Sequence, residues 1–164
     1  MALKKGDAFI SVSLNDKVKL EYCDHAYVDS GATCSISPVI EYFDPISLKQ
    51  RKMPVIICVG NNETLLATAV GDIPLLFNVG DTVRSGTISD VLYCTNITTT
   101  LISASQLNAY GHKVVLNGSE SRIVHKPSDR IVACMHITKS GLYRLDTSPC
   151  PSKVSCPSLC PCRV

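Results

Sequence analysis

The chain has 164 residues, of which 45% are hydrophobic and 18% are charged, and its net charge is +2. This composition excludes a disordered chain, and the length suits one main domain with a tail. No apolar run reaches the roughly 18 residues of a membrane span and no signal peptide is visible, so we expect a cytoplasmic protein with no membrane partner.

Alternating apolar residues predict two strands near the start, over residues 10–14 and 18–22, with a hairpin turn at Asn15-Asp16. A second apolar stretch, residues 26–28, runs directly into Asp29, and a small hydroxyl residue and a glycine follow. This order predicts a strand that ends in a tight loop with a carboxylate at its tip. For residues 38–48, which a proline interrupts, we expect one helical turn or an irregular loop.

The middle of the chain is apolar and β-branched in short runs separated by turn residues, which predicts hairpins rather than helices. The predicted strands are 53–58, 64–70, 73–77 and 83–93, with turns at 60–63 and 79–81 and a break at Gly71-Asp72. The cluster Lys49-Gln50-Arg51-Lys52 is interpreted as a solvated loop, with a nucleic-acid patch as the alternative.

The last third begins with a change of pattern. Residues 103–111 start with a capping-type serine and stop at a glycine, as a short helix does. Strand character returns over residues 112–116, 122–125, 131–137 and 141–145, with a turn at 126–129. From Thr147 onward the sequence is rich in Ser, Pro and Cys and predicts a disordered tail. The nine cysteines predict free thiols rather than a disulfide framework.

The tetrapeptide Asp29-Ser30-Gly31-Ala32 after an apolar pair resembles the active-site motif of aspartic peptidases. The order of hairpin, Asp-Ser-Gly-Ala loop, glycine-turn hairpin, short helix and strand resembles a retropepsin, the half-size aspartic protease of retroelements. Residues 100–107, followed by Gly111 and an apolar run at 114–116, are similar to the segment and helix that pack beneath the active-site loop in that family.

Three further segments, 69–73, 90–93 and 141–145, narrow the resemblance to the Gag-Pol polyprotein of copia-type retrotransposons. The resemblance implies an all-β, retropepsin-like closed barrel with a flap hairpin and one short helix, plus a C-terminal β-hairpin extension. It divides the chain into a protease domain at 1–118, the start of a pre-integrase-like region at 119–147 and the Cys/Pro-rich tail at 148–164. The family's zinc knuckle, integrase and reverse transcriptase have no counterpart, so we expect a fragment, a processed product or a relic.

The resemblance also implies the role of each site residue. Asp29 would be the catalytic carboxylate, Ser30 would brace two loops across a dimer, the Gly31 amide would support the carboxylate, and Ala32 would line the cleft floor. A flap closing over a peptide would comprise Cys58, Val59, Gly60, Asn61, Asn62 and Glu63. Ile102 and Ser103 would belong to the substrate-binding floor. No metal or cofactor is implied.

Aspartic proteolysis needs two carboxylates that share a proton, one acting as base toward a water and the other as acid toward the scissile carbonyl. The chain has one Asp-Ser-Gly, because Asp81-Thr82-Val83 lacks the glycine and is interpreted as a turn. Asp29 would therefore meet Asp29 of a second copy across a twofold axis. The expected partners are a homodimer and a polyprotein peptide, without direct nucleic-acid binding, in the cytoplasm or within virus-like particles.

Other functions stay open at this point. The main alternative is a decayed or repurposed module that keeps the fold, dimer and peptide binding but does not cleave. A ubiquitin-linked shuttle protein also carries Asp-Ser-Gly-Ala, but no ubiquitin-like segment is present here. Minor alternatives are a Cys34 nucleophile, a zinc site on the Cys-x-His pairs at residues 23–25 and 134–136, and a zinc site on the terminal cysteines Cys150, Cys156, Cys160 and Cys162.

Overall fold

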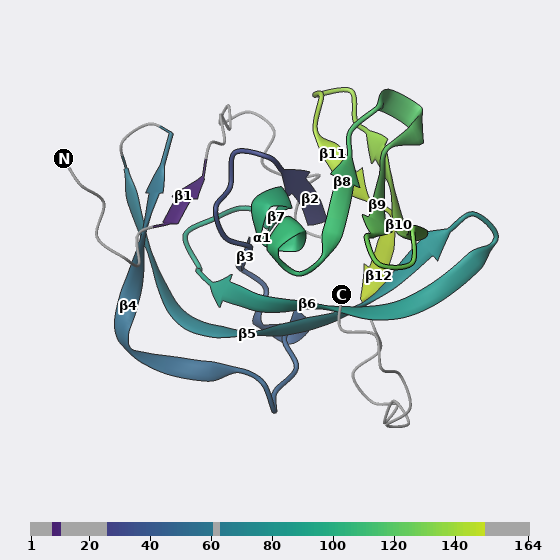
Figure 1. The fold of residues 1–164 in the computed structure, drawn as a ribbon. Helices are drawn as coiled ribbons and strands as arrows, with labels where there is room; N and C mark the ends of the chain where they lie inside the picture. The colour runs from purple at the N-terminus through teal and green to yellow at the C-terminus, as the bar shows by residue number, and fades with distance from the viewer. Residues whose placement is uncertain (1–7, 11–25, 61–62, 150–164) are drawn as a thin grey trace.

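The computed structural model describes residues 8–10, 26–60 and 63–149, and in these ranges it is mostly strand (Figure 1). The hairpin predicted from residue 10 to 22 and the tail from residue 150 fall almost wholly outside them. The elements are β1 (Ala8–Ile10), β2 (Ala26–Asp29), β3 (Ile36–Ser37), η1 (Ile40–Tyr42), β4 (Lys49–Val59), β5 (Thr64–Val79), β6 (Thr82–Tyr93), β7 (Thr100–Ser103), α1 (Ala104–Ala109), β8 (His112–Val115), η2 (Gly118–Glu120), β9 (Arg122–His125), β10 (Arg130–Ile137), β11 (Tyr143–Leu145) and β12 (Thr147–Pro149).

The strands join in one sheet whose order is β1-β4-β5-β6-β3-β7-β2-β11-β10-β9-β8, with β12 paired to β5. The all-β class, the short helix and the C-terminal hairpin β9–β10 are thereby confirmed. The expected closure is wrong, since this path is open and ends at β1 and β8. The described helices include none long and apolar enough to cross a membrane.

The segment from β11 to β12 ties two distant parts of the sheet together. β11 pairs antiparallel with β2, and β12 pairs antiparallel with β5. Between them, the Asp146 N–H donates to the Cys134 carbonyl at 3.0 Å, and its own carbonyl accepts from the Asn78 N–H at 2.8 Å. The tail predicted from Thr147 therefore starts too early, because strand pairing continues to Pro149.

The long ribbon of β5 and β6 forms the base of the molecule in Figure 1, and it corrects one predicted break. β5 runs without interruption through Gly71-Asp72, because its pairing with β6 absorbs an irregularity there. The Asp72 Oδ1 accepts from the Asp90 N–H at 3.1 Å, and Asp90 takes a positive φ of 56°. A bulge thus takes the place of a chain break. The turn predicted at 79–81 is confirmed, with Gly80 at a φ of 59°.

Strand β4 corrects a second prediction. The basic cluster at 49–52, expected in a loop, forms the first part of this strand, and its residues are exposed. This part of the strand was not predicted because its charged residues interrupt the apolar alternation on which strand prediction depends.

The core comprises two clusters, and β2 contributes to both. Ala26 and Val28 pack in one cluster with residues of β5, β6, β7 and β10, whereas Tyr27 packs in the other with residues of β3, β4 and β6. Alternate side chains of a strand point to opposite faces, so β2 is covered on both sides. All three side chains are at least 93% buried. This burial fixes the strand that carries Asp29.

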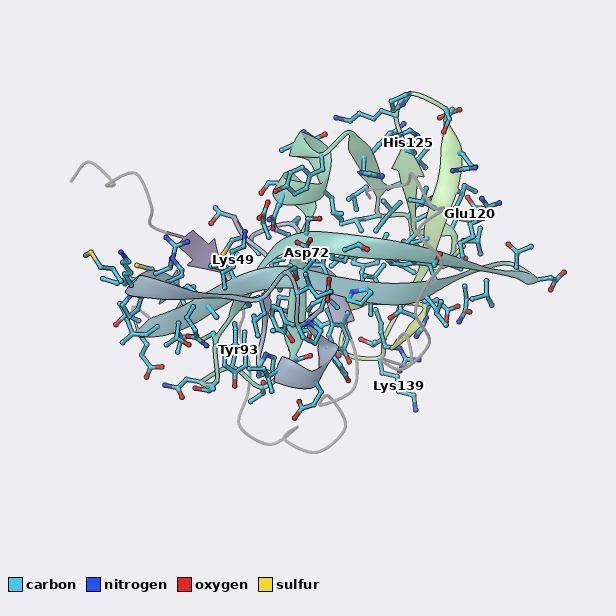
Figure 2. All side chains as sticks on the ribbon, turned by 90° about the horizontal axis from the view of Figure 1, so that it is seen from below. Lys49, Asp72, Tyr93, Glu120, His125 and Lys139 are labelled. Carbon is cyan, nitrogen blue, oxygen red and sulfur yellow. The ribbon has the colours of Figure 1, made fainter. Side chains whose placement is uncertain are left out.

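The C-terminal part of the sheet contains a buried histidine. His112 on β8 faces His125 on β9, with 5.3 Å between ring centroids. His112 is 1% exposed, and its Nδ1 has no hydrogen-bond partner in the described structure. Burial and, secondarily, the neighbouring His125 lower the pKa of His112. In Figure 2, His125 lies well apart from Lys49.

We expect this histidine to make the fold sensitive to acid. The folded state favours neutral His112, because its pKa is lowered there. The contribution of His112 to the free energy of unfolding is therefore complete above the ordinary pKa of 6.5. It is lost as the pH falls from 6.5 through the lowered pKa of the folded state. Urea unfolding at about pH 7.5 and about pH 5 should show a loss of stability that is smaller in His112→Leu. His136→Gln serves as the control. An equal acid dependence in wild type and His112→Leu would contradict this origin.

Candidate active site

The loop after β2 carries the predicted catalytic tetrapeptide, and its tip faces solvent. β2 runs parallel to β7, and Asp29 is the register partner of Ser103. Asp29 is half-buried, Ser30 and Gly31 are exposed, and Ala32 is 1% exposed. The predicted strand ending at a carboxylate is confirmed, since the buried strand β2 ends at Asp29, where the chain turns toward solvent.

The two oxygens of the Asp29 carboxylate have different surroundings. Oδ1 accepts a hydrogen bond from the Gly31 N–H at 2.7 Å. Oδ2 is shielded from solvent and has no partner in the described structure. A shielded carboxylate oxygen without a hydrogen bond is costly, and a catalytic role is one of the explanations for such an exception. The carboxylate is thus held by its own loop through one oxygen, while the other remains unused.

Ser103 fastens this loop to the helix. It is the N-cap of α1, and its Oγ accepts from the Gln106 N–H at 3.1 Å. The same hydroxyl donates to the Ala32 carbonyl at 2.7 Å, and the exposed Ser105 hydroxyl donates to that carbonyl at 3.2 Å. The helix start and the loop that contains Asp29 are therefore one hydrogen-bonded unit.

Ser35 and Gln106 complete this unit, and the sequence analysis missed both. A glutamine three residues after a capping serine normally bonds back to the serine N–H, forming a capping box. Here the Ser103 N–H donates to the Ser35 Oγ at 3.0 Å, and Gln106 Oε1 accepts from the Ser35 N–H at 2.8 Å. Gln106 Nε2 donates to the carbonyls of Ser89 and Asp90, at 3.3 and 3.2 Å. The capping-box spacing was the available signal, but it points to the helix start only.

The predicted flap lies at the end of the β4–β5 hairpin. Cys58 pairs with Thr64, and the Val59 N–H donates to the Glu63 carbonyl at 3.0 Å. Gly60 is exposed, and Asn61 and Asn62 lie outside the described residues. The buried face of the hairpin packs through Ile57 in the cluster that also holds Ala32. The hairpin and the Asp29 loop are thus connected through one core cluster.

The residues predicted for the cleft floor lie beneath the surface. Ile102 and Ser103 are both 0% exposed, and Ala32 is nearly as buried. In this structure they support the Asp29 loop from below, through packing and the Ser103 hydroxyl. Their contact with a substrate stays a prediction.

Cys34 is poorly suited to act as a nucleophile. Burial, with a smaller contribution from Cys94, raises the pKa of the Cys34 thiol to about 11. Only the thiolate is a strong nucleophile, and the raised pKa keeps Cys34 in the thiol form near neutral pH, which argues against this role. The described cysteines, Cys34, Cys58, Cys94 and Cys134, are free thiols as predicted. Within the described ranges no three His, Cys, Asp or Glu side chains are grouped to hold a metal ion. The Cys23–His25 pair and the terminal cysteines lie outside those ranges.

Comparison with known proteins places this loop in a family. The family model for the β-barrel domain of the Pol polyprotein matches residues 26–112, more than half of the chain. The match begins at the first residue of β2 and ends at the first residue of β8, so it includes the Asp29 loop, the β4–β5 hairpin and α1. No curated protein and no solved structure shows significant similarity to the chain. The chain belongs to the Pol polyprotein β-barrel domain family.

Proposed function

We propose that the protein is an aspartic endopeptidase of the retropepsin type, from a copia-type retrotransposon, that cleaves polyprotein peptides. The observation that carries this proposal is the Asp29 carboxylate, with Oδ1 held by the Gly31 N–H and Oδ2 without a partner. Membership of a Pol polyprotein family supports the retroelement context. The chain's Asp-Ser-Gly-Ala sequence supports the reaction class.

In the proposed mechanism, Asp29 of one protomer and Asp29 of its partner share one proton across a twofold axis. Two carboxylates at such short range cannot both ionise, so one remains protonated. The ionised carboxylate takes a proton from a water that attacks the scissile carbonyl, while the protonated one donates to the carbonyl oxygen. Because Oδ2 is shielded from solvent in the single chain, this sharing requires the Asp29 loop to shift when the two protomers meet.

The C-terminal strands bear on how the proposed dimer forms. In retroviral relatives the chain ends interleave in a sheet between protomers. Here β8 pairs with β9 of its own chain, and β11 pairs with β2 beside the loop. We therefore propose that contact centres on the exposed loop tip, Ser30 and Gly31, rather than on interleaved ends. In this proposal the β-hairpin extension replaces those ends.

The shared site predicts that activity depends on protein concentration. Diluting the protein through the dimer dissociation constant should lower turnover per chain steeply, because separated protomers hold one carboxylate each. The measurement is cleavage of a quenched fluorescent peptide across a dilution series, with the mass of the species followed by light scattering. A specific activity that stays constant while the protein becomes monomeric would rule out the shared site.

A statine-type inhibitor of aspartic proteases distinguishes this proposal from a non-catalytic module. Inhibitable cleavage supports the peptidase. Peptide binding without cleavage, at concentrations where the dimer is present, would favour a decayed or repurposed module that keeps the fold.

A further inference from the structure

The first half of β4 forms an exposed basic surface that the proposed mechanism does not use. Lys49, Gln50, Arg51, Lys52, Met53 and Pro54 are all exposed, and Met53 is 79% exposed. Lys49, Arg51 and Lys52 form no ion pair with any residue in the described part of the chain. Three cations in one short stretch, with no ion-pair partner among the described residues, create a positive potential that attracts anions.

An irregularity in the pairing of β4 with β5 leaves part of this stretch outside the regular strand ladder. Gln50 pairs with Ala69 and Val55 pairs with Ala67, so residues 51–54 of β4 face only Thr68 of β5. Surplus residues in one strand bend it and leave the extra backbone groups outside the ladder. The bulge therefore displays side chains and backbone polar groups together.

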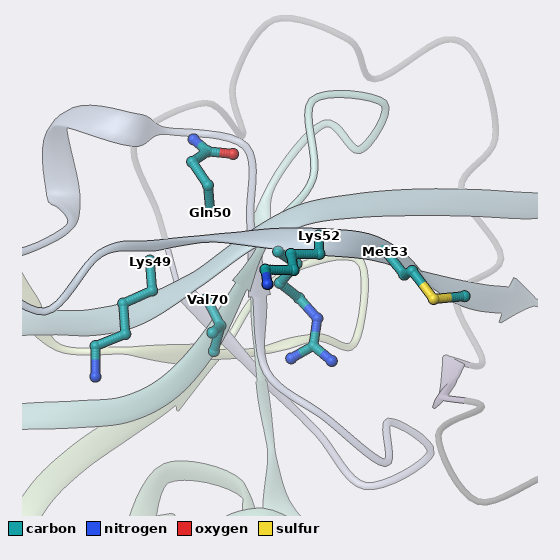
Figure 3. Close-up of a pocket in the computed structure, with 6 residues that line it drawn as sticks. Lys49, Gln50, Lys52, Met53 and Val70 are labelled. Atoms are coloured by element: carbon teal, nitrogen blue, oxygen red, sulfur yellow. The ribbon is translucent and has the colours of Figure 1, made fainter.

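The same residues border a hollow of about 410 Å³. Its lining is Lys49, Gln50, Arg51, Lys52, Met53 and Val70. Figure 3 shows the side chains of Lys49 and Lys52 on β4 and Val70 on β5 around it, with Met53 farther along β4. The lining combines cations, one amide and two apolar side chains, and it contains no acid.

We propose that this surface, Lys49–Met53 with Val70, binds an acidic segment of an extended polypeptide. Glutamate and aspartate side chains suit the three cations, and the apolar parts of such a segment can pack on Met53 and Val70. Backbone groups freed by the bulge can pair with an extended chain as a strand edge does. A nucleic acid fits less well, because the lining offers no aromatic ring on which bases stack.

The position of the surface suggests what it does. β4 begins at Lys49 and ends at Val59, next to the turn of the β4–β5 hairpin. A polyprotein held at this surface would lie against the strand that continues into the predicted flap. A role of this surface in selecting substrates rests on the proposed peptidase function. Its binding of an acidic peptide does not depend on that function.

The test measures binding in the Asp29→Asn background, where loss of cleavage does not affect the result. The probe is a short fluorescent peptide of alternating glutamate and serine, followed by anisotropy. Replacing Lys49, Arg51 and Lys52 together by glutamine should weaken binding about tenfold, and added salt should weaken wild-type binding. The matched control replaces the exposed Arg84, Lys113 and Lys139 by glutamine, which changes net charge equally. Lys139 lies far from Lys49 (Figure 2).

Two results would overturn the inference. One is equal affinity for the acidic peptide in the β4 variant and in the control variant. The other is a short oligouridylate that binds more tightly than the peptide and loses its affinity in the β4 variant, which would make the surface a nucleic-acid site. Failure of cleavage alone would contradict the proposed function and leave this inference standing.

Discussion

Replacing Asp29 by asparagine is expected to abolish peptide cleavage while leaving the fold intact. Asparagine keeps an oxygen that can accept from the Gly31 N–H, which now bonds to Oδ1 at 2.7 Å. It cannot hold or release the proton that the reaction needs, so turnover should fall at least about a thousandfold. Peptide cleavage measures the loss, and thermal unfolding with circular dichroism checks that the fold remains.

Asp81→Asn is the matched control, because Asp81 is also followed by a hydroxyl residue, Thr82, and lies exposed in the turn between β5 and β6. Its turnover should equal that of wild type. Adding Asp29→Asn protein to wild type should lower wild-type turnover, since a mixed dimer has a single acid. Undiminished cleavage by Asp29→Asn would remove Asp29 from the mechanism, and full activity of mixed dimers would remove the shared centre.

Replacing Ser103 by alanine should produce the second large effect, on the stability of the loop and the fold. The substitution removes the N-cap hydrogen bond of α1 and the buried hydroxyl that donates to the Ala32 carbonyl at 2.7 Å. A lost N-cap costs about 1 kcal/mol and a lost buried hydrogen bond about as much again, so the free energy of unfolding should fall by about 2 kcal/mol. Urea unfolding monitored by circular dichroism measures this change.

Ser105→Ala provides the comparison within the same helix. Its hydroxyl donates to the same Ala32 carbonyl, at 3.2 Å, but the residue is exposed and is not the cap. We expect a loss below about 0.5 kcal/mol. Equal losses for the two serines would show that the Ala32 contact, and not the cap, carries the effect. Unchanged stability in Ser103→Ala would show that the loop does not depend on this hydroxyl.

Local patterns predicted much of the architecture. The apolar run of β2 that ends at Asp29 and the glycine turn between β5 and β6 are visible in the sequence, because each depends on residues close together in the chain. The serine that caps α1 is visible for the same reason. Errors arose where the pattern was masked or overridden: at the charged start of β4, at Gly71-Asp72 where a bulge absorbs the irregularity, and at Thr147 where β5 supplies a partner.

The sequence by itself determined that Asp29 stands at the end of an apolar strand, in a loop able to bond its own carboxylate. Only the tertiary structure decided how that loop is held, because Ser35 and Gln106 lie 71 residues apart and their bond exists only after β7 and α1 pack beside β2. The strand order of the open sheet was likewise decided by the tertiary structure, because it depends on pairing between strands that are distant in the chain. Residues near one another in the chain encode turns and caps, whereas contacts between remote segments depend on the packing of the whole core.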